Sequence, residues 1–255
     1  MVKLPFSLLL VIAIACGSIQ KDGPEVGDAH SMFTYYNTIG AIPVLPGYTR
    51  VTARRGSFAE WLRAVPLKKD KTVYLYNGSV KPNQSAQFAV LDISVGNKDL
   101  QQCADAVMRL RAEYLYAEKR YSDIAFMDYS GKWYKWTGGA NRPGFDNYLQ
   151  TVFGWCGSAS LEKQLKAATD FNQIKAGDVL VWGGFPGHAM TVVDVAQNNK
   201  GNIVYMLAQG YQPAQDIHVV VNPENDKMSP WYEVNDAVDI ITPEWRFKTG
   251  NLKTW

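Results

Sequence analysis

A run of three strand patterns between residues 179 and 209 restricts the fold of this chain more than any other feature of its sequence. Residues 179–182 (VLVW) are apolar and end at two glycines, and Pro186-Gly187 leads into a second strand pattern over residues 188–196. Residues 198–201 (NNKG) are typical of a hairpin turn, after which residues 202–209 return as a third strand. Because short turns join antiparallel neighbours, we expect an antiparallel sheet here.

Helix patterns precede this sheet. Residues 57–60 (SFAE) form a capping box and predict a short helix. A long helix is predicted over residues 100–120, with Asp99 as its cap, Gln102 at its third position and an apolar face that begins at Cys103.

The other patterns are weaker. They predict helices over residues 145–153 and after Ser158, and strands over residues 72–76 and 87–94. A largely helical part followed by an antiparallel part indicates an α+β protein. No linker divides residues 32–255, which we therefore expect to form a single domain.

The N-terminus has the layout of an exported protein. Lys3 precedes an almost unbroken apolar run over residues 4–15, which is typical of a signal peptide and short for a membrane span. Small residues before Cys16 resemble the lipobox of bacterial lipoproteins, so residues 1–15 are expected to be removed and Cys16 to carry a lipid. Residues 16–31 are polar and form the expected tether. An ordinary signal peptide with a chance cysteine is the alternative.

These features predict a lipid-anchored protein of the bacterial cell envelope, at the outer membrane or cell surface rather than the inner membrane. With 26 basic and 24 acidic residues the formal net charge is only +2, which argues against a nucleic-acid partner. The three histidines do not cluster, so we expect no metal and no cofactor. We also expect a monomer. The abundant Trp and Tyr suit a groove for peptide or glycan, and equally an aromatic core.

Cys103 and His188 are the candidate catalytic pair. Cys103 lies in the first turn of the predicted long helix, where free amides and the helix dipole favour an anion, so we expect a lowered thiol pKa. His188 opens a strand directly after Pro-Gly. A cysteine at a helix start followed by a histidine on a strand is the papain-like order. Taken singly, each could instead be a buried residue with a structural role.

Gln209 is the candidate that orients the imidazole. Asp194 is expected on the His188 face of its strand but about 20 Å away, which is too far. If the hairpin turns at residues 199–200, His188 faces Tyr211 and has Gln209 as a diagonal neighbour on the same face. An error of one residue in the turn would reverse that face.

Other residues compete for these roles or extend them. His218 is a rival base and Cys156 a rival nucleophile, and we expect both Cys103 and Cys156 to be free thiols. The candidate substrate-binding residues are Gln102, Tyr211 and Trp231, although Trp231 could instead plug the core.

Several stretches resemble known families. "IKAGDVLVWGGFPGHAMTVVDVA" resembles the Gly-Asp and Gly-His strands of NlpC-type and amidase-type cell-wall peptidases, and "QCADAVMRLRAEYL" resembles their cysteine-bearing helix. The chain from Cys103 to His188 is longer than is usual for them, which an insertion around residues 133–153 would explain. Nearly the whole mature chain resembles the bacterial lipoprotein family DUF4846, through "DLQQCADAVMRLRAEYLY", "GDVLVWGGFPGHAMTVVD", "LAQGYQPAQDIHV", "SPWY" and "TPEWRF".

The peptidase resemblance implies a papain-like fold and a cysteine hydrolase acting on amide bonds, with cell-wall peptide as the expected substrate. Cys103 would attack, His188 would move the proton, Gln209 would orient the ring and the Cys103 amide would stabilise the oxyanion. DUF4846 itself has no established function. A non-catalytic lipoprotein that binds glycan or peptide in the same cleft, and a structural lipoprotein with a protein partner, remain as alternatives.

Overall fold

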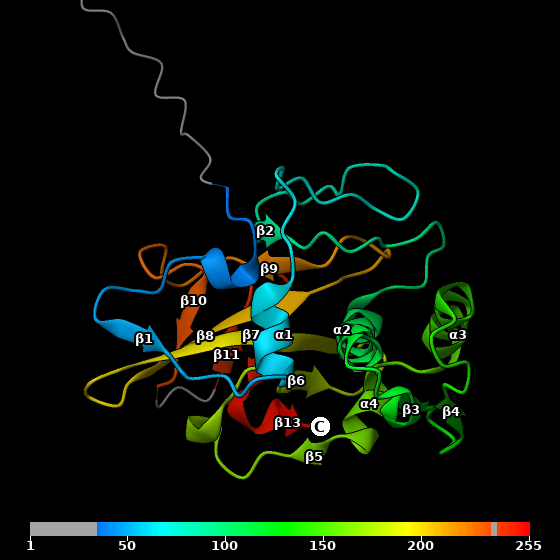
Figure 1. Ribbon diagram of the computed structural model, residues 1–255. Helices are drawn as coiled ribbons and strands as arrows, with labels where there is room; N and C mark the ends of the chain where they lie inside the picture. Colours follow the sequence, from blue (N-terminus) through cyan, green and yellow to red (C-terminus); the bar gives the residue numbers. More distant parts are fainter. Residues whose placement is uncertain (1–34, 236–238) are drawn as a thin grey trace, which may run out of the picture. The chain divides into compact units, whose positions relative to one another are not determined.

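One long β-hairpin organises the protein (Figure 1). It consists of β7 (His188–Asn198) and β8 (Ile203–Gln209), which pair antiparallel along most of their length. The computed structural model describes residues 35–235 and 239–255. The expected signal peptide, Cys16 and tether lie outside the described residues.

Nine antiparallel strands of the described chain form the main sheet, in the order β2-β9-β8-β7-β6-β13-β5, with β1 on β7 and β10 on β8. Their bounds, besides the hairpin, are β1 Tyr48–Arg50, β2 Gln87–Val90, β5 Lys166–Ala167, β6 Val179–Trp182, β9 His218–Val220, β10 Trp231–Glu233 and β13 Leu252–Thr254. Two small sheets pair β3 (Ala125–Met127) with β4 (Trp133–Lys135), and β11 (Asp239–Ile241) with β12 (Arg246–Lys248). The predicted antiparallel sheet is confirmed.

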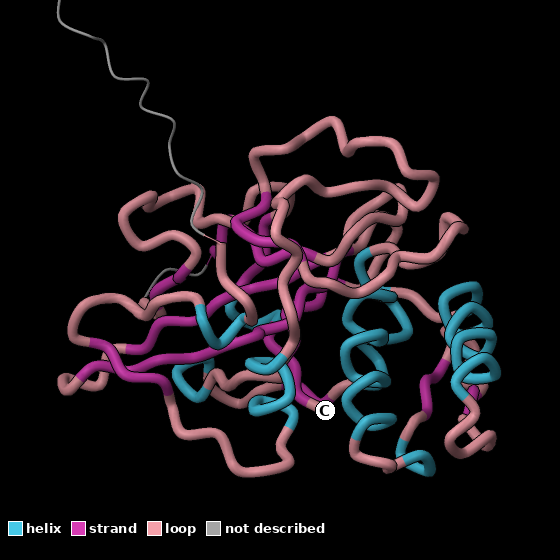
Figure 2. Tube along the Cα trace, turned by 45° about the horizontal axis from the view of Figure 1, so that its top comes forward, coloured by secondary structure: helices cyan, strands magenta, loops and turns pink. Residues whose placement is uncertain are grey.

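Four α-helices occur in the described chain: α1 Phe58–Ala64, α2 Cys103–Ala117, α3 Arg142–Trp155 and α4 Ser158–Gln164. The predicted capping box at α1 is present, since the Ser57 side chain accepts a hydrogen bond from the Glu60 amide. α2 and α3 run side by side (Figure 2). The α+β class is therefore confirmed, with four helices and a large antiparallel sheet.

The long helix begins three residues later than predicted. Gln102, not Asp99, is the N-cap of α2, and Asp105 at the third position accepts a hydrogen bond from the Gln102 amide. Asp99 is engaged elsewhere, because its Oδ1 accepts from the amide of Ala214. Cys103 is therefore the first helical residue, within the predicted first turn.

Other bounds also differ from the predictions. Residues 72–76 make only isolated bridges at Tyr74 and Leu75 instead of a strand, although the Asn77-Gly78 turn is present, with Gly78 at φ +82°. β2 ends at Val90 rather than at residue 94. Ser158 is the first residue of α4 and not its cap, which is Gly157.

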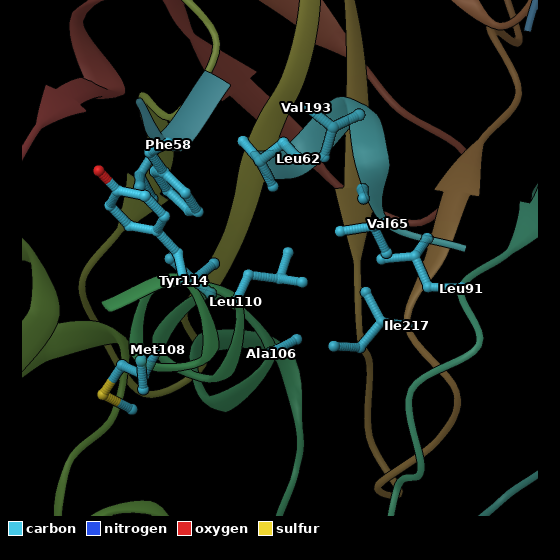
Figure 3. Packing of buried hydrophobic residues seen from close by; sticks show 14 of the residues in the cluster. Phe58, Leu62, Val65, Leu91, Ala106, Met108, Leu110, Tyr114, Val193 and Ile217 are labelled. Carbon is cyan, nitrogen blue, oxygen red and sulfur yellow. The ribbon is translucent and has the colours of Figure 1, made fainter. Parts of the chain in front are cut away.

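Both faces of the central hairpin are buried. On one face α1 and α2 pack on β7, and Figure 3 shows Val193 of β7 among Leu62 of α1 and Leu110 of α2. On the other face, Met190 and Leu207 pack with residues of the β11–β12 sheet. Among the described residues no helix is long and apolar enough to cross a bilayer.

A β-bulge sets the register of the hairpin. Next to the turn the pairs are Gln197 with Ile203 and Asp194 with Met206, whereas further along Thr191 pairs with Ala208. The turn is therefore centred on Lys200 and not between residues 199 and 200 as predicted, which shifts the pairing register by one residue. The extra residue in β7 between Val192 and Asp194 compensates for this shift.

The same bulge corrects the predicted orientation of Asp194. Its carboxylate lies on the α1 face, where it accepts from Arg50 Nε at 2.6 Å and from Arg63 Nε at 2.7 Å. The bulge gives Val193 and Asp194 the same face, so that Asp194 does not share the face of His188. This buried carboxylate ties β1 and α1 to β7.

Candidate functional site

The Cys103 thiol lies at the start of β7. Its Sγ is 3.9 Å from the carbonyl oxygen of Gly187, the residue before His188. The thiol is only partly buried and borders a cavity of about 330 Å³. The walls are the starts of α2 and α4 and the loop between β6 and β7, and they include Gln102, Cys156, Ser158, Phe185, Gly187 and Gln212.

The predicted lowering of the thiol pKa is wrong. Burial raises the pKa of Cys103 to about 11, and the charge of Asp105 adds to the rise. The amides of Cys103, Ala104 and Ala189 act in the opposite direction but do not offset the desolvation. Sequence reasoning recognised the helix terminus but not the depth at which the sulfur lies.

His188 and Gln209 are in direct contact, as the strand alternation predicts. The imidazole Nε2 lies 2.8 Å from Gln209 Oε1, and both side chains are almost fully buried. The ring is enclosed by the aromatic side chains of Tyr211, Trp245 and Phe247, with centroid distances of 5.1, 5.3 and 5.7 Å. These contacts fix the plane of the imidazole.

Burial lowers the pKa of His188 to about 4. The positive charge of Lys81 contributes in the same direction, whereas the hydrogen bond to Gln209 opposes it. At neutral pH both Cys103 and His188 are therefore uncharged.

The thiol and the imidazole approach β7 from different directions. A Cβ on Gly210 would lie 2.8 Å from the carbonyl oxygen of Gln102, so the α2 start lies directly over this part of the sheet. Continuing the hairpin register places Ala189 opposite Gly210 on the α2 face, and His188 therefore points to the other face.

The sulfur lies at the edge of β7 beyond the last pair that β8 makes with it, beside the Gly187 carbonyl and the Ala189 amide. Thiol and imidazole thus share one corner of the sheet. Among the described residues the sulfur makes no hydrogen bond to the imidazole.

The rival candidates lie in less suitable places. His218 is fully buried, with Nδ1 3.0 Å from the Asp216 carbonyl oxygen and Nε2 3.2 Å from Gln209 Nε2, so both ring nitrogens are engaged. Cys156 is buried, and desolvation raises its thiol pKa further than that of Cys103. Both Cys103 and Cys156 are free thiols, as predicted.

The candidate substrate-binding residues separate into two groups. Gln102 borders the cavity beside the thiol, whereas Tyr211 packs on the imidazole. Trp231 is 1 % exposed and its indole N–H donates to the Pro43 carbonyl at 2.8 Å, so it belongs to the core. Its neighbour Tyr232 is also buried.

Sequence reasoning missed a charged pair beside the imidazole. Lys81 Nζ lies 2.6 Å from Glu244 Oε2, and the same carboxylate oxygen accepts from Gln209 Nε2 at 2.7 Å. Both charged residues come from irregular segments, where no periodicity marks a buried position. The available signal was the stretch "TPEWRF", which contains Glu244, Trp245 and Phe247.

The described chain is thus an α+β protein with a cysteine at a helix start and a buried His-Gln pair at the same corner of an antiparallel sheet. It belongs to the DUF4846 family, described as a domain of unknown function (4846), whose model matches residues 40–143 and 127–254. No curated protein and no solved structure matches it. Within the described residues, no three His, Cys, Asp or Glu side chains gather in a way that could hold a metal ion.

Proposed function

We propose that this protein is a papain-like cysteine hydrolase of the bacterial cell envelope that cleaves an amide bond, with cell-wall peptide as the substrate class. The observation that carries the proposal is the 2.8 Å contact between His188 Nε2 and Gln209 Oε1, at the corner where a cavity reaches the Cys103 thiol. Gln209 engages Nε2 of the ring, and in the proposed mechanism Nδ1 is the base that accepts the thiol proton.

The reaction begins from two neutral groups. Because the imidazole lies on the other face of the sheet, the mechanism requires the sulfur to turn away from the Gly187 carbonyl and around the end of β7. It then passes its proton to His188 Nδ1 and forms a bond to the substrate carbonyl carbon. Backbone amides at the start of α2 stabilise the oxyanion, since the first N–H groups of a helix lack intrahelical acceptors. The C–N bond then breaks, and the leaving amine takes the proton from the imidazolium.

Water completes the cycle. It attacks the thioester while His188 accepts its proton, and the acid product leaves as the thiol is restored. Gln209 holds the imidazole in one orientation through both steps. Because the resting pair is neutral, proton transfer accompanies attack instead of preceding it.

The cavity lining suits a substrate that carries hydrogen-bonding groups. Backbone carbonyls and Gln102, Ser158 and Gln212 offer hydrogen bonds, and Phe185 at the rim is 90 % exposed. A lipid on Cys16 would hold this cavity near the cell wall through the polar segment 16–31.

The experiment is a digest of purified cell-wall peptides with the purified protein, followed by mass spectrometry. The wild type should release new amine termini, and Cys103→Ser and His188→Gln should each abolish the release. Cys156→Ser is the matched control and should retain it. Product release that persists in Cys103→Ser would overturn the assignment of the nucleophile.

A second candidate is a non-catalytic protein that binds glycan or peptide in the same cavity. The raised thiol pKa and the lack of a thiol–imidazole hydrogen bond, among the described residues, favour it. Calorimetric titration with cell-wall fragments separates the two candidates. Binding that survives Cys103→Ala without any turnover by the wild type supports the binding protein.

A further inference from the structure

We propose that Glu244, held in place by Lys81, is a positioning residue that fixes the orientation of the Gln209 amide and thereby places the proton of His188 on Nε2 and its lone pair on Nδ1. The inference concerns the tautomer of the ring, and its catalytic meaning rests on the proposed function.

Both oxygens of the Glu244 carboxylate are held by hydrogen-bond donors. Lys81 is 4 % exposed, and its ammonium group lies 2.6 Å from Glu244 Oε2. Gln209 Nε2 lies 2.7 Å from that same oxygen, and Asn83 donates to the other carboxylate oxygen at 3.1 Å. A carboxylate paired with a lysine is an acceptor only, so the Gln209 group that faces it must be the NH2 group.

His218 gives the same answer independently. Its Nδ1 lies 3.0 Å from the Asp216 carbonyl oxygen, which can only accept, so Nδ1 carries the hydrogen. The neutral ring then has its lone pair on Nε2, which lies 3.2 Å from Gln209 Nε2. Both hydrogens of the Gln209 NH2 group thus have acceptors on one side of the amide.

The opposite end of the amide is therefore its carbonyl oxygen. Gln209 Oε1 faces His188 Nε2 at 2.8 Å, and an amide oxygen accepts only. Nε2 of His188 must donate, and the lone pair of the neutral ring is on Nδ1. The network begins at a buried ammonium group and ends at the nitrogen that the proposed mechanism needs as its base.

Nitrogen-15 NMR of the substrate-free protein at neutral pH tests the inference directly, because the two ring nitrogens of a neutral imidazole differ in shift according to which carries hydrogen. Wild type should show His188 as a single tautomer with the hydrogen on Nε2, and His218 with the hydrogen on Nδ1. His188 found with its hydrogen on Nδ1 would overturn the proposal without any variant.

Variants test the part played by Glu244. The double substitution Lys81→Met with Glu244→Leu replaces the pair by apolar groups and leaves no unpaired charge. It should weaken the single-tautomer signature of His188, so that a second population with the hydrogen on Nδ1 appears, because of the two acceptors described for the Gln209 NH2 group only His218 Nε2 then remains. Glu244→Gln keeps an acceptor oxygen and should preserve the signature. Asn83→Ala removes the bond to the far carboxylate oxygen and the local bonds that Asn83 accepts from Ser85, but not the contact between Glu244 and Gln209, and should leave the signature unchanged. An unaltered signature in the folded double variant would show that Glu244 does not set the tautomer.

The tautomer and the hydrolase are separable in these experiments. The expected tautomers without cleavage of cell-wall peptide would retain the positioning role and reject the hydrolase. If the protein does cleave, the double variant should lower kcat and leave KM unchanged, since neither Lys81 nor Glu244 borders the cavity at Cys103.

Discussion

Cys103 and His188 differ from a preformed thiolate–imidazolium pair in one physical respect. Both are desolvated, and within the part of the chain that the structure describes neither has a neighbour of opposite charge close enough to stabilise its ionised form. The raised pKa of the thiol and the lowered pKa of the imidazole both favour the neutral state.

Alkylation of Cys103 should therefore depend steeply on pH. With a thiol pKa of about 11, the iodoacetamide rate should rise about tenfold for each pH unit between 7 and 10, because only the thiolate reacts. Peptide mapping after timed labelling measures the rate, and the more buried Cys156 should react more slowly still. A rate that is constant between pH 5 and 8 would instead show a preformed ion pair.

The buried imidazole should make stability sensitive to acid. The folded-state pKa of His188 is about 4 and the unfolded value about 6.5, so the unfolded state binds the extra proton and stability is lost as pH falls from 6.5 toward 4. His188→Gln removes this titrating group. The free energy of unfolding of the variant should therefore fall less steeply with acid than that of the wild type, by about 1.4 kcal/mol per pH unit in that window. Urea titrations of both proteins measure the difference, and parallel curves would contradict the pKa shift.

At the scale of elements, the start of α2 is the contact on which the site depends most. The helix lies so close to the sheet that only a glycine fits at residue 210, and Ala106 and the Gln102 carbonyl are its nearest neighbours. This close approach of the α2 start to the sheet places the Cys103 sulfur beside β7.

Gly210→Ala should separate these elements. The added Cβ would lie 2.8 Å from a backbone oxygen and 3.1 Å from the Ala106 Cβ, so the free energy of unfolding should fall by about 1–3 kcal/mol. Urea denaturation measures it.

Gly154→Ala is the matched control. No atom of the described residues outside α3 lies within 4 Å of a Cβ at this position, and alanine is the better helix former. This variant should therefore be unchanged or more stable by up to about 1 kcal/mol. Equal losses in both variants would contradict the close approach at Gly210.

What the sequence predicted depends on how regular each element is. The alternation of β7 and β8 correctly predicts that His188, Gln209 and Tyr211 lie together. The predicted turn is wrong, but the extra residue of the bulge restores the predicted pairing at the His188 end of the hairpin. The α2 start was misplaced because Asp99, a good cap by type, is used by a distant amide. Lys81 and Glu244 could not be found, since partners that meet from irregular loops leave no periodic pattern.

At the scale of the whole molecule, the body is described by the structure, whereas the lipid anchor is predicted from the sequence alone. The body has its own core on both faces of the sheet. The anchor is predicted from Cys16 and the residues before it, which lie outside the described residues.

Cys16→Ser should change location without changing the fold of the body. The wild type, expressed in a bacterial host, should partition into detergent and carry the mass of an acylated N-terminal cysteine. The variant should lose both properties, whereas Cys156→Ser should keep them. Identical partitioning and mass for wild type and Cys16→Ser would refute the lipid anchor.

The extra residue at Val193 decides which face of the sheet each end of the hairpin presents. Val192 pairs with Leu207 and Asp194 with Met206, so loss of Val193 alone would keep every pair but exchange the faces of the residues on one side of it relative to those on the other. His188 and Gln209 would stay together and turn toward the side that α2 covers. In an alignment of the family, lineages that retain the histidine and the glutamine should therefore show no single-residue deletion in the strand between the histidine and the turn.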